Sequence, residues 1–393
     1  MLFLAHRVPH PPNRGDRIRS FHLLQYLAER AELSLAYLAD HPTPQETHRA
    51  LARLCRRVTA ERLGPARWLR AAGSLAAGRT ATEGLFRSGR LDRTLRQWAA
   101  ETRFDLVVVF CSSMAQYLDV PGLAGVPAVV DLVDVDSEKW FHYARAARGP
   151  GRLLYGVEGR RLRRLEASLA DRARAITLVS RAEADLYRSF RPAENVYAVP
   201  NGVDLDYFRP TVEPEPDGVP PCVFVGALDY RANLDGLAWF CRAVWPEVYA
   251  RVPGAALQIV GSNPGRAARR LADRPGVEFI GPVPDVRPYL AAAVAVVPLR
   301  IARGIQNKVL EAMAMGRPVV GTPEAFEGLE LQPGRDALCA AAPGAWRDRL
   351  IDLLRNPTER IGLGAAARRY VEAHHHWPRC LQRFGEIVAA ADA

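Results

Sequence analysis

A short loop and the helix that follows it, in the C-terminal half of the chain, carry residue types suited to binding an anion. An apolar run ends at Pro298, the loop Leu299–Ile305 follows, and the pattern predicts a helix over Gln306–Met315. Gly304 lets backbone N–H groups approach a ligand, and a helix N-terminus adds partial positive charge. Formal charge comes from three cations: Arg300, Arg303 and Lys308. This combination predicts a site for a diphosphate.

Glu311 lies about one turn into the same predicted helix, three residues after Lys308. A carboxylate there can accept hydrogen bonds from two neighbouring sugar hydroxyls. The same spacing is typical of an i,i+3 ion pair on a solvated helix face, and spacing alone leaves both interpretations open. Neither half contains G-x-G-x-x-G after a strand or a P-loop, which disfavours a dehydrogenase or a kinase-like NTPase.

A second group of polar residues follows the first strand. The loop Pro11–Gly15 precedes a predicted helix that Asp16 is expected to cap, and Arg17 is placed to contact a phosphate or an acceptor. His6 ends the strand and is expected to face the ligand. An ordinary strand-to-helix turn with a solvated helix face remains the alternative.

Parallel sheets must position these residues. The first half alternates short apolar runs with longer helical patterns, which predicts a parallel sheet covered on both faces. The expected strands are Leu2–Ala5, Leu33–Leu38, Asp105–Phe110, Ala128–Val133, Ala175–Val179 and Val196–Val199. The expected helices include Asp16–Arg30, Leu91–Glu101 and Arg152–Arg174.

The alternation stops in a proline-rich stretch and then restarts. The later strands are expected at Cys222–Gly226, Leu257–Gly261, Val277–Ile280, Val294–Pro298 and Pro318–Gly321, with a helix at Asn233–Ala250. We therefore predict an α/β chain of two Rossmann-like, doubly wound parallel-sheet domains. Residues 1–207 form the first, 208–221 a stiff linker, 222–376 the second, and 377–393 a helix that packs back on the first. Ligands of such sheets bind at the carboxyl ends of the strands.

Composition limits the class of protein. The 393 residues are 49% hydrophobic, as in globular proteins, and six scattered cysteines without C-x-x-C predict neither a disulfide framework nor a zinc site. No apolar run reaches the ~18 residues of a membrane span, so we expect a cytoplasmic protein. The net charge of +10 favours an anionic partner. Aromatic and basic residues do not alternate, so nucleic acid is not predicted.

Several segments resemble glycosyltransferase family 4. Lys308–Thr322 with Glu327–Leu329 is similar to the family's donor-site signature, and Val199–Asp204 with Phe208–Pro210 is similar to its interdomain crossing. The resemblance implies the GT-B fold, a nucleotide diphosphate sugar as donor substrate, and no cofactor or metal. With the residues inferred from the loops themselves, the predicted donor-binding residues are Gly15, Arg17, Asn201, Gly226, Arg231, Arg303, Gly304, Ile305, Gln306, Lys308 and Glu311.

Two N-terminal segments resemble a subgroup of that family. Pro9–Ser20 and Asp131–Trp140 are similar to sugar transferases of exopolysaccharide clusters, of the type associated with PEP-CTERM/exosortase systems. This resemblance implies transfer onto a lipid-linked or growing glycan at the cytoplasmic face of the membrane.

The sequence departs from the family pattern at two places. Family members commonly carry two glutamates separated by seven residues; Glu311 matches the second, implied to bind the ribose, but Arg303 stands at the first. An arginine cannot accept a hydrogen bond from a sugar hydroxyl, although it can bind phosphate or a carboxylated sugar. Ala227 replaces an arginine of many relatives, which leaves Arg231 as the nearest cation, or as a surface residue before a helix N-cap at Asn233.

Asp131, Asp134 and Asp136 follow the fourth expected strand. A D-x-D pattern can hold a metal ion on a diphosphate, as in the GT-A architecture, but that architecture leaves the second half of the chain unexplained. We expect these residues to face the acceptor together with His6. Helix capping by Asp136 or Ser137 is the structural alternative.

The resemblance implies a retaining, metal-independent transferase in which Arg231 and Lys308 stabilise the leaving diphosphate and Asp134 contacts the acceptor hydroxyl. Two alternatives stay open: a nucleotide-sugar epimerase and a non-catalytic nucleotide-sugar-binding protein. The basic and apolar segment Gly159–Leu165 also predicts peripheral attachment to an anionic membrane surface, with a solvated arginine face as the alternative.

Overall fold

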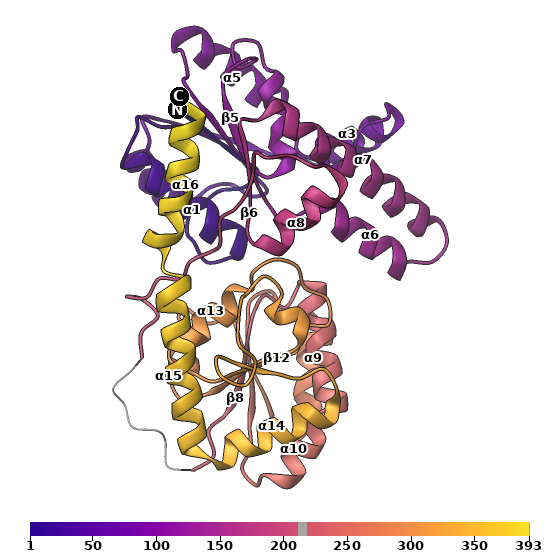
Figure 1. Cartoon of the computed structure of the whole chain (residues 1–393). Coiled ribbons are helices and arrows are strands. Elements are labelled where there is room, and N and C mark those ends of the chain that lie inside the picture. Colours follow the sequence, from indigo (N-terminus) through magenta and orange to yellow (C-terminus); the bar gives the residue numbers. More distant parts are fainter. Residues whose placement is uncertain (211–217, 393) are drawn as a thin grey trace. The chain divides into compact units, whose positions relative to one another are not determined.

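The computed structural model describes residues 1–210 and 218–392, which form two compact units. Unit 1 contains Met1–Val199 and Leu381–Ala393, and unit 2 contains Pro200–Cys380. Residues 211–217, half of the predicted linker 208–221, lie outside the described residues. Figure 1 shows helices on both faces of the sheet in each unit, and each unit is considered separately below.

The described residues of unit 1 form a seven-stranded parallel sheet in the order β3-β2-β1-β4-β5-β6-β7. Its strands are β1 (Leu2–Ala5), β2 (Ser34–Ala39), β3 (Arg57–Arg62), β4 (Val107–Phe110), β5 (Ala128–Val133), β6 (Ala175–Leu178) and β7 (Val196–Ala198). Its helices are α1 (Gly15–Ala28), α2 (Gln45–Leu54), α3 (Arg67–Ala76), α4 (Ala81–Leu85), α5 (Gly89–Glu101), η1 (Ser112–Asp119), α6 (Asp136–Ala146), α7 (Pro150–Arg172) and α8 (Arg181–Phe190).

Unit 2 has a six-stranded parallel sheet in its described residues, in the order β10-β9-β8-β11-β12-β13. The strands are β8 (Cys222–Val225), β9 (Leu257–Val260), β10 (Val277–Gly281), β11 (Val294–Val297), β12 (Val319–Gly321) and β13 (Leu338–Cys339). The helices are α9 (Arg231–Ala243), α10 (Trp245–Arg251), α11 (Arg266–Arg269), η2 (Arg270–Asp273), α12 (Arg287–Leu290), α13 (Asn307–Ala314), η3 (Pro323–Phe326), α14 (Pro343–Arg355) and α15 (Pro357–His374).

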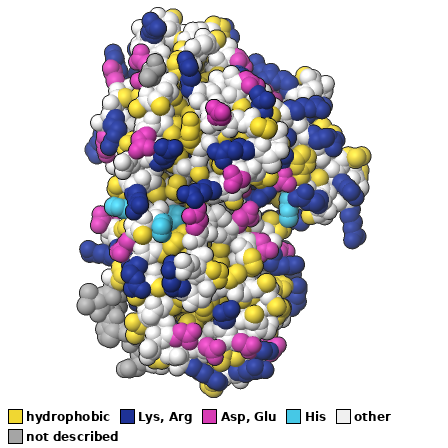
Figure 2. Space-filling model, in the orientation of Figure 1, with side chains coloured by type: hydrophobic (Ala, Val, Ile, Leu, Met, Phe, Trp, Pro, Cys, Tyr) yellow, Lys and Arg dark blue, Asp and Glu magenta, His cyan; other side chains and the backbone are white. Residues whose placement is uncertain are grey.

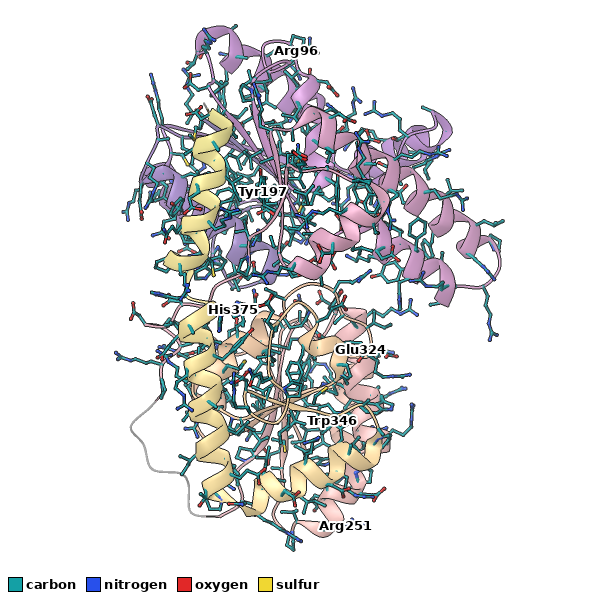
Figure 3. The ribbon with its side chains drawn as sticks, in the orientation of Figure 1. Arg96, Tyr197, Arg251, Glu324, Trp346 and His375 are labelled. Atoms are coloured by element: carbon teal, nitrogen blue, oxygen red, sulfur yellow. The ribbon has the colours of Figure 1, made fainter. Side chains whose placement is uncertain are left out.

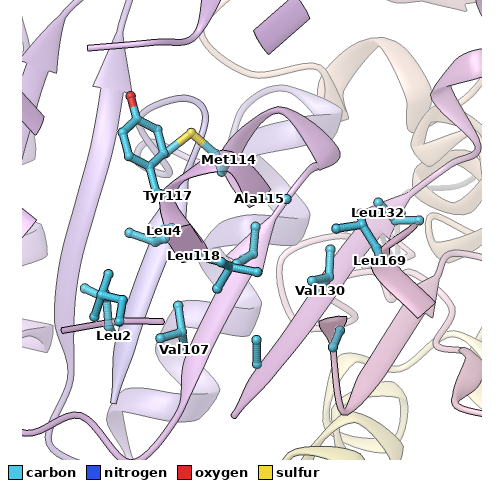
Figure 4. Packing of buried hydrophobic residues seen from close by; sticks show 14 of the residues in the cluster. Leu2, Leu4, Val107, Met114, Ala115, Tyr117, Leu118, Val130, Leu132 and Leu169 are labelled. Carbon is cyan, nitrogen blue, oxygen red and sulfur yellow. The ribbon is translucent and has the colours of Figure 1, made fainter. Parts of the chain in front are cut away.

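Apolar strands buried on both faces explain why the sheets are parallel. Every residue of β1, β2 and β4 is buried, so these strands lack the alternation of a half-exposed sheet. Leu2, Leu4, Val107 and Val130 belong to the core of unit 1 (Figure 4). In unit 2, helix side chains pack against the sheet around Trp346, whose ring lies 5.3 Å from that of Phe240 (Figure 3).

The order of strands reverses once in each sheet. β1 lies between β2 and β4 in unit 1, and β8 lies between β9 and β11 in unit 2. The crossovers leave in opposite directions at these points, so the loops after the two central strands separate and create space for a ligand. The doubly wound fold predicted from the sequence is confirmed, and it identifies the ends of β1/β4 and β8/β11 as the places to search for sites.

The last helix, α16 (Trp377–Asp392), contributes residues from Leu381 onward to unit 1. Its Phe384 is fully buried, and the guanidinium of Arg383 lies 5.7 Å from the ring centroid of Tyr197 at β7 (Figure 3).

The structure differs from the predicted elements at several places, among them the strand β13, which the sequence did not predict. The helix expected over Asn233–Ala250 is two helices, α9 and α10, which meet at Val244; Pro246 lies in the first turn of α10 and cannot continue a preceding helix. β3 was missed because its residues are largely polar and partly exposed. Asp16 does not cap α1: it lies in the first turn and forms an ion pair with Arg7 at 3.1 Å.

A buried carboxylate joins α6 to α7 and gives the fold a pH dependence. Glu166 is fully buried, accepts a hydrogen bond from Ser137 N–H at 3.0 Å, and also bonds the Ser137 hydroxyl. Burial raises the pKa of Glu166 from 4.5 to about 8. Because the folded protein then holds this proton more tightly than the unfolded chain, the contribution is complete below about pH 4.5 and is lost as the pH rises towards 8.

We predict that Glu166→Gln removes part of this dependence. From pH 6 to pH 8 the wild-type protein should lose at most about 2.5 kcal/mol through Glu166, at ~1.36 kcal/mol per pK unit. The variant should lose correspondingly less. Urea unfolding at both pH values measures this, and identical pH slopes for the two proteins would contradict the assignment.

Candidate functional site

The candidate site of unit 2 lies at the reversal point of its sheet and centres on Lys308. The Lys308 ammonium donates a hydrogen bond to the Asn233 Oδ1 at 2.6 Å and lies 4.9 Å from the ring centroid of Phe224. A Cβ atom at Gly226 would lie 3.1 Å from the ammonium, so the absence of a side chain there leaves its space open. Residues from β8, α9 and α13 thus meet at one point.

Burial shifts the pKa values of Lys308 and Glu311 in the direction that favours their neutral forms. It lowers the pKa of Lys308 to about 8, opposed by the nearby charge of Glu311. It raises the pKa of Glu311 to about 7, opposed by Lys308. Titratable groups with shifted pKa values are concentrated at functional sites. At this site a bound anion would stabilise the charged ammonium of Lys308, which burial disfavours.

Asn233 was predicted to be a helix N-cap, and this prediction is wrong. The N-cap of α9 is Tyr230, while Asn233 is buried one turn inside, with its amide donating to the Ala227 carbonyl at 2.7 Å. Its carbonyl oxygen holds Lys308. Arg231, the first residue of α9, is exposed, and its side chain makes no ion pair within the described residues.

The loop before α13 has the backbone expected of an anion site. Gly304 has φ +62°, a conformation that glycine adopts without strain. The N-cap of α13 is Gln306, whose side chain makes no capping bond and instead donates to the Arg303 carbonyl at 3.0 Å. The first N–H groups of α13, next to Gly304 and Ile305, therefore keep their capacity to bind an anionic oxygen.

Arg300 and Arg303, the other two cations of the predicted phosphate site, each pair with a carboxylate. Arg300 lies 3.7 Å from Asp235 of α9, so it points toward that helix. Arg303 forms an ion pair with Glu327 at 2.9 Å, and both side chains are 33% exposed. The ion pair brings a carboxylate to the loop in which the expected glutamate is missing. Sequence reasoning missed Glu327 as a site residue, although it lies in the family-like segment Glu327–Leu329.

Asn201 lies beside the start of α13. It is buried, and its amide donates to the Asn307 Oδ1 at 3.1 Å. The carbonyl of Asn201 lies 2.8 Å from His375 Nδ1, next to the end of α15 (Figure 3). Burial lowers the pKa of His375 to about 4, so the ring is neutral near pH 7 and donates this bond. Asn201 therefore positions α13 within unit 2.

Close packing of α9 on the end of β11 sets the geometry of the site. A Cβ atom at Gly236 would lie 2.2 Å from the Pro298 carbonyl oxygen, which is far closer than atoms can approach. We predict that Gly236→Ala forces α9 away from the loop and destabilises the protein by about 2–3 kcal/mol.

The matched control is Gly362→Ala. This glycine also lies inside a helix, α15, but nothing lies within 4 Å of an added Cβ. Gly362→Ala should be neutral or stabilise by up to ~1 kcal/mol, since alanine favours helix. Chemical unfolding of both variants checks the prediction, and an equal effect of the two would contradict it.

The corresponding edge of unit 1 gathers the residues predicted to face an acceptor. His6 follows β1 and stacks on Phe110 with ring centroids 5.7 Å apart, and its Nε2 lies 4.0 Å from the Cys111 sulfur. Burial lowers the pKa of His6 to about 4, so the ring is neutral. Its Nδ1 is buried without a hydrogen-bond partner within the described residues.

The acidic residues of this edge fall into two environments. Burial, followed by the charges of Glu183 and Asp136, raises the pKa of Asp134 to about 7. The Asp134 Oδ1 is also buried without a partner in the part of the chain that the structure describes. Asp136 begins α6 and its carboxylate accepts a hydrogen bond from the Ser112 hydroxyl at 3.3 Å. Asp134 is thus suited to bind or accept a proton from a hydroxyl group.

Asp131 was predicted to face the acceptor, but its side chain is fully buried. It forms an ion pair with Arg19 at 2.8 Å, and its other oxygen accepts a hydrogen bond from Val133 N–H at 2.9 Å. Val133 has φ +67°, a strained conformation for a β-branched residue. Arg19 also donates to the Val199 carbonyl at 2.9 Å. Asp131 therefore shapes the loop that carries Asp134 and does not itself reach solvent.

Gly15 and Arg17 lie in the first turn of α1, near the end of β1. Arg17 is partly buried, and its Nε has no hydrogen-bond partner among the described residues. Among those residues no group of three or more His, Cys, Asp or Glu side chains is arranged to hold a metal ion.

Two family profiles match successive parts of the chain. Residues 15–202 match the glycosyl transferase 4-like domain, and residues 220–356 match the glycosyl transferases group 1 domain. The two domains follow each other in the order that the two sheets show. The chain belongs to the glycosyltransferases with the GT-B fold.

Within that family the chain is similar to two curated mannosyltransferases. A GDP-mannose-dependent alpha-(1-6)-phosphatidylinositol monomannoside mannosyltransferase of Mycobacterium tuberculosis is 28% identical over 250 residues, covering 57% of this chain and 64% of the relative. A GDP-mannose-dependent monoacylated alpha-(1-6)-phosphatidylinositol monomannoside mannosyltransferase of Corynebacterium glutamicum is 30% identical over 220 residues, covering 48% of this chain and 55% of the relative. The match thus spans less than two thirds of either relative.

Solved structures share the fold over nearly the whole chain. The HepE protein of Anabaena, solved in complex with UDP and glucose, is 14% identical with a TM-score of 0.69 and 99% of both chains covered. The sucrose-phosphate synthase of Thermosynechococcus elongatus is 19% identical with a TM-score of 0.72 and 98% of both chains covered. At these identities the comparison supports the GT-B fold alone.

Proposed function

We propose that this protein transfers a sugar from a nucleotide diphosphate sugar to an acceptor. The observation that carries the proposal is the Lys308 cluster: a partly buried ammonium beside an uncapped helix N-terminus and a glycine loop, at the ligand-binding edge of a Rossmann-like sheet. That arrangement supplies what the diphosphate of a donor needs, which is formal charge together with aimed N–H groups.

The leaving diphosphate is the group that these residues stabilise during the reaction. As the bond between the sugar and the diphosphate breaks, negative charge grows on the phosphate oxygen, and Lys308 and the N–H groups of Gly304–Gln306 stabilise it. Arg231, exposed at the first turn of α9, supplies a further cation. Glu311 accepts hydrogen bonds from the ribose. This assignment requires no protein nucleophile, which fits a retaining reaction in which the diphosphate accepts the acceptor's proton.

We infer that Glu327 contacts the sugar of the donor. Arg303 occupies the place of a sugar-binding glutamate, and a guanidinium cannot accept a hydrogen bond. The Glu327 carboxylate, held by Arg303 at 2.9 Å and partly exposed, can accept hydrogen bonds from sugar hydroxyls in its stead. The acceptor is assigned to unit 1, with Asp134 and His6 as its polar contacts and Asp136 beside them.

The relatives support a proposal for the donor and acceptor classes. Two curated relatives use GDP-mannose and act on phosphatidylinositol mannosides, so we propose a GDP-linked hexose as the first donor to test and a lipid-linked or growing glycan as the acceptor. A role in exopolysaccharide synthesis at the cytoplasmic face of the membrane fits the subgroup that the N-terminal segments resemble. No helix in the described residues is long and apolar enough to cross a bilayer.

The test is incubation of the protein with GDP-, UDP- and dTDP-sugars, each with and without membrane lipid extract. The proposal predicts nucleotide release that depends on the acceptor, with one base preferred. Isomerised sugar without an acceptor would identify an epimerase instead. Tight binding of a nucleotide sugar with no turnover under any condition would identify a binding protein.

A further inference from the structure

The segment Gly159–Leu165, from whose sequence we predict membrane attachment, uses several of its side chains in contacts within unit 1. Gly159–Leu165 combines arginines with apolar residues, but it is largely packed. Arg161 donates to the carbonyls of Leu75 at 2.7 Å and Arg79 at 2.8 Å, and Arg163 forms an ion pair with Glu138. Leu162 is fully buried. These three side chains join α7 to its neighbours, and Arg160 and Arg164 are the exposed residues of the segment.

Exposed apolar side chains lie elsewhere on the same elements. In the described residues of unit 1, all large hydrophobic side chains classed as exposed occur as two adjacent pairs: Trp68 (64% exposed) and Leu69 (78%) on α3, and Leu153 (72%) and Leu154 (51%) on α7. Single exposed apolar residues are ordinary on soluble proteins. Two pairs on neighbouring helices are less so, because each exposes a contiguous apolar area.

The two helices that carry these pairs are joined directly. Besides the Arg161 bonds to the end of α3, the Glu158 carboxylate of α7 accepts hydrogen bonds from Ala81 N–H at 2.6 Å and Thr82 N–H at 2.9 Å, at the start of α4. Figure 1 shows α3 and the hairpin of α6 and α7 on the same side of unit 1. The helices that carry both apolar pairs therefore lie on one side of that unit.

The two segments that carry the apolar pairs contain arginines and no acidic residue, although Arg67 pairs with Asp40 and Arg145 with Glu138 of other segments. From Gly64 to Arg79 the chain carries three arginines and no acidic residue, and from His142 to Val157 it again carries three arginines and no acidic residue. Arg148 and Arg152, at the tip of the hairpin, are exposed and lie within 4 Å of no carboxylate in the part of the chain described. Figure 2 shows dark blue basic side chains beside yellow hydrophobic ones where this hairpin projects.

An aromatic cluster holds the hairpin in shape. The ring of Trp140 lies 5.7 Å from that of Tyr155 and 6.1 Å from that of Tyr143, between α6 and α7. Tyrosine and tryptophan suit the boundary between lipid and water because they combine an apolar ring with a polar atom. A pre-shaped hairpin can also insert its tip without an ordering cost.

We propose that α3 and the α6–α7 hairpin form one docking surface for an anionic lipid bilayer, with Trp68, Leu69, Leu153 and Leu154 inserted and with Arg148 and Arg152 on the lipid phosphates. The combination of apolar insertion and basic surround is what interfacial binding requires. A second copy of this chain is the less suitable occupant, since an isologous contact would place arginines against arginines. The inference extends the membrane role proposed above, but it does not depend on which sugar is transferred.

The test is sedimentation of the full chain with vesicles of phosphatidylcholine alone or with about 30% phosphatidylglycerol, at low and high salt. We expect binding to the anionic vesicles only, weakened by salt. The double variants Leu153→Ser/Leu154→Ser and Trp68→Ala/Leu69→Ser should each bind at least about tenfold more weakly. Ile361→Ser, which replaces a residue 60% exposed on α15 of unit 2, is the matched control and should bind as the wild type.

Three results would overturn the surface: no binding to anionic vesicles at low salt, equal binding by the double variants and the wild type, or a lipid-independent dimer that Leu153→Ser/Leu154→Ser dissociates. The last result would assign the patch to a second copy of the chain. Nucleoside diphosphate binding, measured on the same samples, separates this test from the proposed enzymatic function. It should be unchanged in every variant, and its absence in the wild type would count against the donor site without bearing on the lipid surface.

Discussion

Lys308→Met is expected to lower the rate of sugar transfer by about 10²–10³-fold, the usual cost of removing one preorganised group that stabilises charge in the transition state. Methionine keeps an apolar side chain over the Phe224 ring, so the fold should survive while the ammonium is lost. The effect should appear mainly in kcat, because the charge on the leaving diphosphate grows as the bond breaks. Initial rates with saturating donor measure it, alongside thermal unfolding to establish that the variant is folded.

The matched control for Lys308 is Arg300→Met. Arg300 is a cation of the same site region, but its guanidinium lies beside Asp235 and is half exposed. We expect its replacement to change the rate by less than about threefold, as for an exposed ion pair. Similar losses in the two variants would mean that general positive charge, and not the placement of Lys308, supports the reaction.

Glu327→Gln is expected to lower transfer by about 10–100-fold while nucleoside diphosphate affinity stays within about twofold of the wild type. The glutamine keeps the size of the side chain but weakens its hydrogen bonds to sugar hydroxyls, and Arg303 loses its counter-charge. The split between transfer and nucleotide affinity identifies a contact with the sugar. The measurement is a pair of titrations, one with the nucleotide sugar in a rate assay and one with the free nucleoside diphosphate.

Glu324→Gln is the control for that change. Glu324 lies three residues earlier in η3 and is exposed (Figure 3). Its replacement should leave both quantities unchanged. If Glu327→Gln weakened nucleoside diphosphate binding as much as it slowed transfer, the Arg303–Glu327 pair would be holding the phosphate loop, and the assignment to the sugar would be wrong.

Local signals explain how much of the fold the sequence predicts. The runs Leu2–Ala5 and Ala128–Val133 are short, continuous and apolar, and both are strands with the predicted bounds. Such runs are buried on both faces, so burial and β-propensity favour the same structure. The strand β3 was not predicted, for the opposite reason: Arg57–Arg62 is mostly polar, and its pairing with β2 decides its conformation.

The site was predictable as far as its residues are close in sequence. The glycine loop, the start of α13 and the Lys308–Glu311 spacing all lie within one short segment. The contacts that define its chemistry do not: Lys308 meets Asn233, and Arg303 meets Glu327 from another loop. The pairing of these charges depends on how the loops after the strands pack together. The spacing of residues along the sequence does not predict that packing.

Burial was the second quantity that the sequence did not reveal. Asp131, Asp134 and Asp136 lie within one turn of chain and have the same side chain, yet only Asp131 is fully buried, against Arg19. Its role changed from acceptor contact to support for the strained Val133. Asp131 is thus a positioning residue and Asp134 a candidate contact for the acceptor. Only the three-dimensional packing distinguishes the two roles.

Calorimetric titration of the protein with a nucleoside diphosphate and the matching nucleoside monophosphate tests the central claim most directly, for the wild type and for Lys308→Met. If the Lys308 cluster binds the second phosphate, the wild type should bind the diphosphate at least about tenfold more tightly, and the variant should lose most of that preference. Equal affinities for the two nucleotides in the wild type, or an undiminished preference in the variant, would contradict the assignment of this site to the donor diphosphate.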